Sequence, residues 1–285
     1  MTVLGLIGTG LLGTAIAERL ISDGHHVIGY DTNAESLRQF RQLGGTAADS
    51  AQDVYSQCLH VFLSLPDSSI VRSVIAAVPL VQAGTLVIDT TTGAPADAME
   101  ISELLSKWSA SYLDATIAGS SEQVKHREAV AMVGGTLESY QSALPLLSCF
   151  TCQQFHTGAN GSGSTVKLIV NLVLGLNRLV LAEGLSLAAS CGVNLPMVLE
   201  ILKSGAAYSR VMDVKGEKMI RGEFSPPQAR LDQHWKDVRL ILELGRQHQQ
   251  SLPLSELHEQ LLEQASKLGC GSLDNSSIIK VLSKS

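Results

Sequence analysis

Hydrophobic and polar residues follow two different patterns along the chain. As far as residue 157, short apolar runs alternate with amphipathic segments. The apolar runs predict strands at 3–7, 26–30, 59–65, 85–89, 112–115, 129–133 and 153–156. Apolar residues spaced three to four positions apart predict helices at 11–22, 34–42, 69–77, 94–108 and 137–147. This alternation indicates a doubly wound sheet of parallel strands covered on both faces.

The pattern becomes entirely helical in the second part of the chain. Residues 158–164 are rich in glycine and serine, which predicts a turn with Ser162 or Ser164 as the cap of a following helix. A long apolar helix is predicted from Thr165 to about Cys191, followed by shorter helices. The fold class is therefore α/β: a Rossmann-like domain at 1–160, joined by the long helix to an all-α domain at 161–285.

Composition narrows the class of protein. The 285 residues are 45% hydrophobic and carry a net charge of −6, which disfavours disorder and nucleic-acid binding. An apolar strand follows Met1 directly, so we expect no signal peptide. The most apolar stretch, 168–187, contains Asn171, Arg178 and Glu183, which favours burial in protein over a membrane. These features predict a cytoplasmic protein.

A glycine-rich loop follows the first predicted strand and opens the first predicted helix. Gly8 permits a tight turn, Gly10 lets a pyrophosphate approach the backbone, and Gly13 lets the helix pack against the strand. The phosphates would then lie at the positive end of the helix. The candidate cofactor-binding residues of this loop are Gly8, Thr9, Gly10, Leu11, Leu12 and Gly13.

Asp31 ends the next predicted strand, 18 residues after Gly13. A carboxylate there can accept hydrogen bonds from the ribose hydroxyls and repels a 2′-phosphate. Thr32 and Asn33 supply no arginine for such a phosphate, so the sequence predicts NAD in preference to NADP. The alternative is that the glycines serve packing and that Asp31 is a turn residue.

Lys167 and Asn171 lie four residues apart on the long predicted helix. Their side chains are separated by about 40° around its axis, and Arg178 falls between them. Burial lowers the pKa of a lysine, which suits a group that donates and accepts a proton near neutral pH. The alternative is a Lys167 that extends to solvent and an Asn171 that is hydrogen-bonded in the core.

Over nearly its whole length the sequence resembles the β-hydroxyacid dehydrogenases, a group that includes 3-hydroxyisobutyrate dehydrogenase and tartronate semialdehyde reductase. Besides the glycine-rich loop, residues 87–95 resemble the family's Asp-x-Ser-Thr-x-x-Pro segment. The other matching segments are Tyr112-Leu113-Asp114-Ala115 with Gly119, Met132-Val133-Gly134-Gly135, Gly161-x-Gly163-x-x-x-Lys167-x-x-x-Asn171, and Lys236-Asp237.

The resemblance implies an NAD(P)-dependent oxidoreductase that interconverts a small 3-hydroxy acid and its semialdehyde or oxo acid. Lys167 would take the hydroxyl proton as hydride leaves for the nicotinamide, or donate a proton in the reverse reaction. Asn171 would orient Lys167 and the substrate, and Lys236 would close over the cofactor.

The resemblance also implies the surroundings of the reacting groups, at the interface between the domains. Leu65, Pro66 and Thr92 would line the nicotinamide. The candidate substrate-binding residues are Ala118, Gly119, Ser120, Asn171 and Lys236. The substrate would be a small anionic hydroxy acid or semialdehyde.

The substrate-binding segment departs from the family's pattern. Ala118 replaces the serine of the usual Pro-Val-Ser-Gly-Gly, although Ser120 and Ser121 offer hydroxyls nearby. Gln123 and Arg127 stand where glycines are expected, and Lys125, His126 and Arg127 form a basic run. This run either binds a larger or more acidic head group or is a solvated surface loop, which is the simpler interpretation.

Several alternatives stay open at this point. An imine-reductase-like enzyme shares the two-domain layout, but such relatives usually lack the lysine found at Lys167. A sugar-phosphate decarboxylating dehydrogenase has a longer helical region and His-Asn in place of Val170-Asn171. A third alternative is a nucleotide-binding interaction module without catalytic activity.

Two further expectations concern cysteine chemistry and assembly. Cys149 and Cys152 form a lone C-x-x-C pair, which favours packing over redox chemistry or zinc. The histidines show no metal-ligand spacing, so no metal is expected. The apolar surface of the long helix predicts a homodimer or homotetramer.

Overall fold

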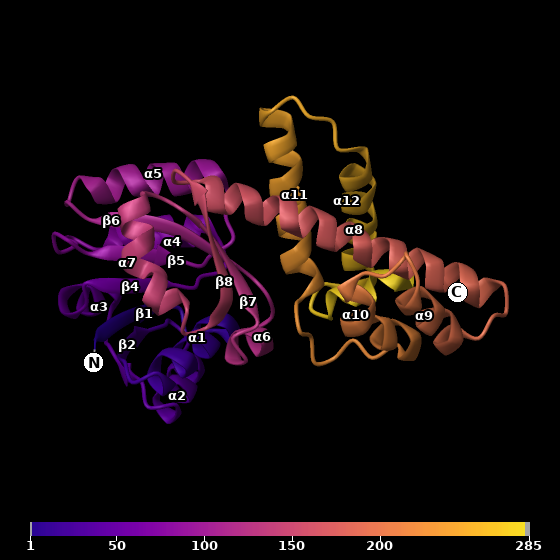
Figure 1. Cartoon of the computed structure of the whole chain (residues 1–285), viewed down its shortest axis with the longest axis horizontal. Helices are drawn as coiled ribbons and strands as arrows, with labels where there is room; N and C mark the ends of the chain where they lie inside the picture. Colours follow the sequence, from indigo (N-terminus) through magenta and orange to yellow (C-terminus); the bar gives the residue numbers. More distant parts are fainter. Residues whose placement is uncertain (1, 283–285) are drawn as a thin grey trace. The chain divides into compact units, whose positions relative to one another are not determined.

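The structure is a computed structural model that describes residues 2–282. The chain divides into two compact units, Met1–Lys167 and Leu168–Ser285. Helix α8, Ser162–Ser190, begins in the first unit and continues into the second (Figure 1).

Within the described residues, the first unit contains an eight-stranded sheet with the order β3-β2-β1-β4-β5-β6-β7-β8. The strands are β1 Val3–Ile7, β2 His26–Tyr30, β3 Thr46–Ala47, β4 His60–Leu63, β5 Leu86–Asp89, β6 Ser111–Ala118, β7 Ala129–Gly134 and β8 Thr151–Gly158. Strands β1 to β6 are parallel, whereas β7 is antiparallel to β6. Strand β7 departs from the parallel arrangement that is typical of a doubly wound sheet, because residues 119–128 are too few for a crossover connection.

Helices cover both faces of this sheet (Figure 1). They are α1 Leu11–Ser22, α2 Ala34–Gln42, α3 Ala51–Gln57, α4 Ser68–Ala77, α5 Pro95–Ser106, α6 Ser121–Lys125 and α7 Leu137–Leu147. Every predicted strand and helix of this unit is present, with bounds within three residues of the prediction. The structure also contains β3, α3 and α6, which the sequence does not predict because they are too short to show a periodic pattern.

The core of the first unit lies on the two faces of the sheet. Strand β5 shows the alternation, because Leu86 and Ile88 belong to one buried cluster and Val87 to the other. Strands buried on both faces read as continuous apolar runs, which explains why the sequence pattern located them well.

The second unit is helical. Besides most of α8, it contains α9 Leu195–Ser204, α10 Arg210–Arg221, α11 Leu231–Gln247, α12 Pro253–Ala265 and the short helices η1 Ser266–Cys270 and η2 Asn275–Val281. Its core includes Leu185 of α8, Leu199 of α9, Val238 of α11 and Leu262 of α12. Although α8 is long and apolar enough to cross a membrane, 44% of its most apolar window is buried inside the protein.

Candidate active site

The residues predicted to bind a nucleotide follow the carboxyl ends of neighbouring parallel strands. The glycine-rich loop follows β1, Asp31 follows β2, Leu65 follows β4 and Thr92 follows β5. The register aligns Ile7 with both Tyr30 and Leu63, so these strands end at one edge of the sheet. Ligands of doubly wound sheets bind at this edge, where the order of the strands reverses, here between β1 and β4.

Two glycines of the loop are required by close backbone contacts. Gly8 has a φ of +95°, and a Cβ atom on it would lie 2.2 Å from the carbonyl oxygen of Ser64. A Cβ atom on Gly13 would lie 1.9 Å from the carbonyl oxygen of Gly8. These contacts bring the start of α1 close to the ends of β1 and β4.

The N-terminus of α1 has the features of a phosphate-binding site. Gly10 occupies the N-cap position, and no side chain caps the helix. Gly10 is exposed, and a Cβ atom on it would meet no atom within 4 Å. Because the first amides of a helix need acceptors, this exposed and uncapped end fits a pyrophosphate. The residues present therefore fit a dinucleotide.

The carboxylate of Asp31 is held against the glycine-rich loop. Its Oδ2 accepts a hydrogen bond from the backbone N–H of Thr9 at 2.7 Å, and its Oδ1 accepts one from the N–H of Asn33 at 2.8 Å. These bonds fix the carboxylate beside the loop, where an adenosine ribose would lie.

A buried acid supports the segment after β5. The N–H of Thr91 and the hydroxyl of Tyr112 donate to the Asp89 carboxylate at 2.8 and 2.7 Å. Burial raises the pKa of Asp89 to about 6, although both of these residues lower it in part. Thr91 in turn accepts a hydrogen bond from the N–H of Leu65 at 3.1 Å. The ends of β4 and β5, which carry the predicted nicotinamide-lining residues, are thus tied together.

The predicted substrate-binding segment, Ala118 to Ser120, is followed directly by the short helix α6. Ser120 caps α6 through a reciprocal pair of hydrogen bonds: its Oγ accepts from the N–H of Gln123, whose side-chain oxygen accepts from the N–H of Ser120. This capping box explains why Gln123 can replace a glycine at this position. Gly119 has a φ of +150°, and a Cβ atom on it would lie 2.9 Å from that of Ala129.

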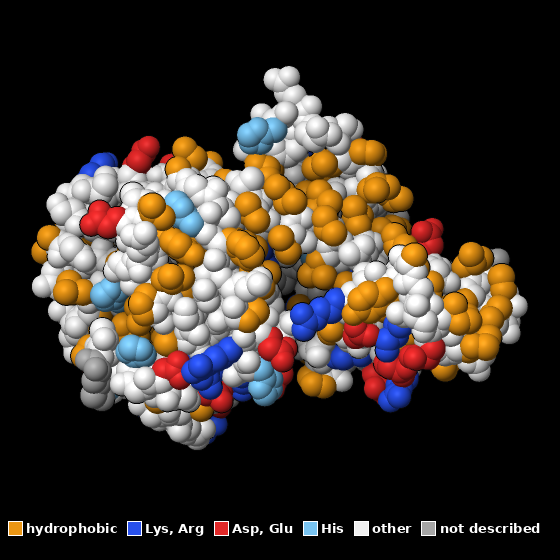
Figure 2. Space-filling view, viewed as in Figure 1, with side chains coloured by type: hydrophobic (Ala, Val, Ile, Leu, Met, Phe, Trp, Pro, Cys, Tyr) orange, Lys and Arg blue, Asp and Glu red, His pale blue; other side chains and the backbone are white. Residues whose placement is uncertain are grey.

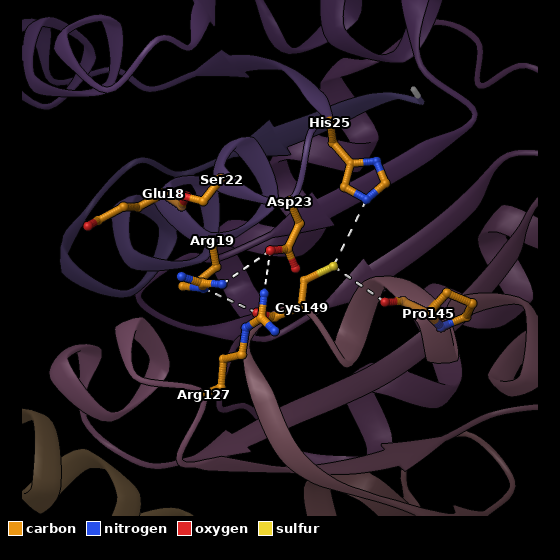
Figure 3. Close-up of polar contacts among 8 residues, drawn as sticks. All are labelled: Glu18, Arg19, Ser22, Asp23, His25, Arg127, Pro145 and Cys149. Atoms are coloured by element: carbon orange, nitrogen blue, oxygen red, sulfur yellow. Dashed lines mark hydrogen bonds and ion pairs between the residues drawn. The ribbon is translucent and has the colours of Figure 1, made fainter.

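The basic run that follows is paired with acids of the first unit. Lys125 forms an ion pair with Glu18 at 3.2 Å, and His126 contacts Glu122 at 3.0 Å. Arg127 forms an ion pair with Asp23, toward which Arg19 also points (Figure 3). The loop is therefore fastened to the end of α1, in agreement with the simpler interpretation of this sequence.

The conformation of Arg127 explains the glycine expected there. Its φ of +57° lies in the left-handed region, which glycine adopts without strain. In this conformation the side chain of Arg127 is paired with Asp23.

Cys149 lies beside the same ion pairs and is not poised as a nucleophile. Its Sγ donates a hydrogen bond to the carbonyl oxygen of Pro145 at 3.4 Å and lies 4.0 Å from Nε2 of His25 (Figure 3). Burial, with the nearby Asp23, raises the pKa of this thiol to about 11. Cys149 and Cys152 are both free thiols. A thiol that stays protonated favours packing over redox chemistry.

The predicted catalytic residues lie on α8. Lys167 is half-buried on its second turn, and Asn171 is buried one turn later, within the second unit. Nδ2 of Asn171 donates a hydrogen bond to Oδ2 of Asp237 at 2.9 Å, and Nζ of Lys236 lies 3.4 Å from Oδ1 of the same acid. Asp237 thus links Asn171 to Lys236, a role that the sequence analysis did not assign.

Further buried polar groups continue along the Asn171 face of α8. A Cβ atom on Gly175 would lie 2.6 Å from Nε2 of His234 and 2.9 Å from Cε1 of His258, so only glycine admits these rings. Burial lowers the pKa of Arg178 to about 10, although Asp274 and Asp237 act in the opposite direction. The angular proximity of Arg178 to Asn171 was visible in the sequence, but its buried surroundings were not.

An open helix N-terminus at the switch point of a doubly wound sheet, with a glycine-rich loop before it and Asp31 beside that loop, is typical of a dinucleotide-binding protein. Comparison with known families agrees with this. Residues 3–158 match the model described as the NAD binding domain of 6-phosphogluconate dehydrogenase. Residues 161–282 match the model described as NAD-binding of NADP-dependent 3-hydroxyisobutyrate dehydrogenase.

Individual relatives span nearly the whole chain. The chain is 30% identical to 2-(hydroxymethyl)glutarate dehydrogenase of Eubacterium barkeri, over 98% of this chain and 94% of that protein. The crystal structure of 3-hydroxyisobutyrate dehydrogenase from Salmonella typhimurium has a TM-score of 0.91 at 25% identity, covering 99% of this chain and all of that one. An imine reductase from Pseudomonas sp., at 18% identity and 99% coverage of both chains, shares the fold with a TM-score of 0.66.

The chain belongs to the β-hydroxyacid dehydrogenase family. It is an NAD(P)-dependent oxidoreductase of the 3-hydroxyacid dehydrogenase and reductase type.

The pairing of Arg127 with Asp23 generates a test of the basic run. We expect Arg127→Ala to change the KM for the acid substrate by less than about twofold, because the side chain is already paired and helps to fasten the loop. Steady-state kinetics would measure this, with Arg38→Ala, which breaks the exposed pair with Glu35, as the control. A KM raised about tenfold or more would instead assign Arg127 to the substrate's anionic group.

Proposed function

We propose that this chain interconverts a small anionic 3-hydroxy acid and its semialdehyde or oxo acid, with Lys167 as the general acid and base. The observation that carries the proposal is the position of Lys167 within the first unit. Its helix begins with two backbone amides bonded to Asp114 of β6, a residue in register with Asp89 at the end of β5. Lys167 therefore lies within one helical turn of a residue, Ser164, that is bonded to β6 at the level where β5 ends. The nucleotide-binding residues lie at this edge of the sheet.

The chain's own residues supply binding, orientation and one proton. The bound nicotinamide supplies the hydride acceptor or donor. In oxidation the neutral amine of Lys167 accepts the proton of the substrate hydroxyl, and in reduction its ammonium donates a proton to the carbonyl oxygen. Asn171 orients the substrate oxygen, and its bond to Asp237 fixes the orientation of the amide. Lys236, next to the same acid, provides a positive charge for the anionic groups.

The segment from Ala118 to Ser120 is proposed to bind the substrate's carboxylate. Ala118 lacks the usual hydroxyl, and the hydroxyl oxygen of Ser120 already accepts the N–H of Gln123. That bond leaves the hydrogen of the Ser120 hydroxyl available, so in this proposal Ser120 and backbone amides of the segment donate to the carboxylate. The name of the Eubacterium barkeri relative denotes a hydroxy acid with two carboxylates, which supports the inclusion of larger anions among the substrates to be tested.

The test of the reaction is turnover by the wild type and by Lys167→Ala. NADH absorbance would be followed with 3-hydroxyisobutyrate, D-glycerate, 4-hydroxybutyrate, 3-sulfolactaldehyde and succinic semialdehyde, each with the NAD and NADP forms. We expect kcat to fall about 10²–10⁴-fold in Lys167→Ala, because the proton has no other positioned acceptor in this proposal. Undiminished turnover in the variant would contradict the role of Lys167. Stabilisation by NADH without turnover of any compound would favour the interaction module.

The preference for NAD over NADP is proposed from the charge of Asp31. Its carboxylate is fixed by Thr9 and Asn33, so it cannot easily turn away from a 2′-phosphate. We expect Asp31→Asn to lower the KM for NADP about tenfold or more, because the repulsion between the two anions is removed. Steady-state kinetics with both cofactors would measure the ratio of kcat/KM values. A ratio that does not move would contradict this role.

We also propose that a second copy of the chain covers the exposed side of α8. Hydrophobic side chains gather over the helical unit (Figure 2). Ile169, Val173, Val180 and Leu187 are each more than half exposed, at 53%, 53%, 66% and 64%. Their spacing places them within about 40° of one another, on a stripe along the helix. A straight apolar stripe can pack against its own copy about a two-fold axis, which supports a homodimer or a homotetramer built from such dimers.

Light scattering would test this assembly. We expect the wild type to have at least twice the mass of one chain, and the double variant Val180→Glu, Leu187→Glu to have the mass of one, because charges on the stripe disfavour its burial. Leu80→Glu, at an exposed position of the first unit, is the matched control and should leave the mass unchanged. A wild type that is monomeric at micromolar concentration would contradict the proposal.

A further inference from the structure

The carboxylate of Asp114 binds the start of α8. Asp114 lies inside β6 and is 2% exposed. Its Oδ1 accepts a hydrogen bond from the N–H of Gly161 at 2.9 Å, and its Oδ2 accepts one from the N–H of Ser164 at 2.8 Å. An acid from a distant strand thus caps the helix, whereas the sequence predicted that Ser162 or Ser164 would be the cap. The hydroxyl of Ser162 is instead bonded to that of Thr157 at 2.7 Å.

A second side chain of β6 holds the same turn. The hydroxyl of Thr116, which is fully buried, donates to the carbonyl oxygen of Gly163 at 3.0 Å. Residues 114 and 116 project from the same face of the strand, so both contact the first turn of the helix. Together they hold two N–H groups and one carbonyl group of residues 161–164, where α8 begins.

Glycine makes this close approach sterically possible. A Cβ atom on Gly163 would lie 2.2 Å from the carbonyl oxygen of Asp114. A Cβ atom on Gly134, in β7, would lie 2.5 Å from Oδ1 of Asp114. The start of α8 therefore rests directly on the backbones of β6 and β7 and has little room to shift.

The position of Asp114 along its strand connects this anchor to the proposed reaction. Asp114 is in register with Asp89, the last residue of β5, and β6 continues for four residues to Ala118. One strand therefore holds the start of α8 and leads into the proposed substrate-binding segment. Lys167 follows Ser164 by three residues, a rise of about 4.5 Å along the helix.

We propose that Asp114 is a positioning residue for Lys167, and that Thr116 assists it. The two side chains fix the start of α8 on β6, and this sets the distance between the Lys167 amine and the substrate segment at the end of the same strand. The proposal rests on the function proposed above, because it assumes that Lys167 transfers the proton. In this proposal Asp114 influences the rate of the reaction, whereas a residue that only caps and stabilises the helix would not.

The test compares three variants of the full chain. Asp114→Asn keeps one side-chain oxygen, which can accept from either Gly161 or Ser164. Its NH2 group can only donate, so the other of these two N–H groups loses its acceptor. Thr116→Val removes the hydroxyl that donates to Gly163 at 3.0 Å and to Met132 of β7 at 3.3 Å, but it leaves the Asp114 carboxylate in place and should fold even if Asp114→Asn does not. Leu147→Ala is the matched control, because Leu147 is fully buried in α7 of the same unit and belongs to its core. Each would be assayed with NAD and the compound of the panel above that the wild type turns over fastest.

We expect kcat to fall about tenfold or more in Asp114→Asn and by a smaller factor in Thr116→Val, because small displacements of a reacting group are costly. The KM for NAD should stay within about twofold, since the glycine-rich loop is unchanged. Hydrogen exchange should show faster exchange at the amides of Gly161 and Ser164 in Asp114→Asn. Leu147→Ala should lower the melting temperature yet leave kcat and these amides near their wild-type values.

Three other results would contradict the role of Asp114 or the proposed reaction. If the wild type turns over and both β6 variants keep their kcat, Asp114 does not position Lys167. The same conclusion follows if Leu147→Ala lowers kcat as much as they do, because the loss then reflects general destabilisation. If the wild type turns over none of the compounds, the proposed reaction fails, and hydrogen exchange alone decides whether Asp114 anchors α8.

Discussion

The first amides of an α-helix have no partners within the helix, and this constraint shapes both ends of the candidate site. At the start of α1 no side chain serves as a cap, and Gly10 leaves the amides accessible. At the start of α8 the Asp114 carboxylate occupies the corresponding place. The protein thus keeps one helix N-terminus open for an external anion and closes the other with an internal one. The first arrangement suits a cofactor, and the second suits a fixed catalytic side chain.

Close packing of backbones is the means by which these two helix ends reach the sheet. Gly8 and Gly13 bring α1 against the ends of β1 and β4, and Gly163 brings α8 against β6 and β7. In each case a single Cβ atom would overlap a carbonyl oxygen, so these positions tolerate no larger residue without a shift of the backbone. The glycines therefore determine distances within the site, although they take no part in the chemistry.

Helix α8 carries different chemistry on its two sides. Asn171, Gly175 and Arg178 lie one or two turns apart on the buried side, among the polar groups of α11 and α12. Burying a polar group is costly unless it is hydrogen-bonded, and Asn171 meets this requirement through its bond to Asp237. The opposite side is an apolar stripe exposed in the single chain. This division explains how one helix can be apolar enough to resemble a membrane span and still carry the buried amide of Asn171.

Local patterns in the sequence determined the strands, the long helices, the glycine-rich loop and the Lys167–Asn171 spacing. Each of these depends on residues close together in the chain, so periodicity and spacing record them. Three features that shape the site depend on distant residues: Asp114 is 47 residues from Gly161, Asn171 is 66 from Asp237, and Arg127 is 104 from Asp23. A side-chain bond between distant segments leaves no periodic trace in the sequence. Only the tertiary structure decided that an acid inside a strand caps α8 and that the basic run is fastened to α1.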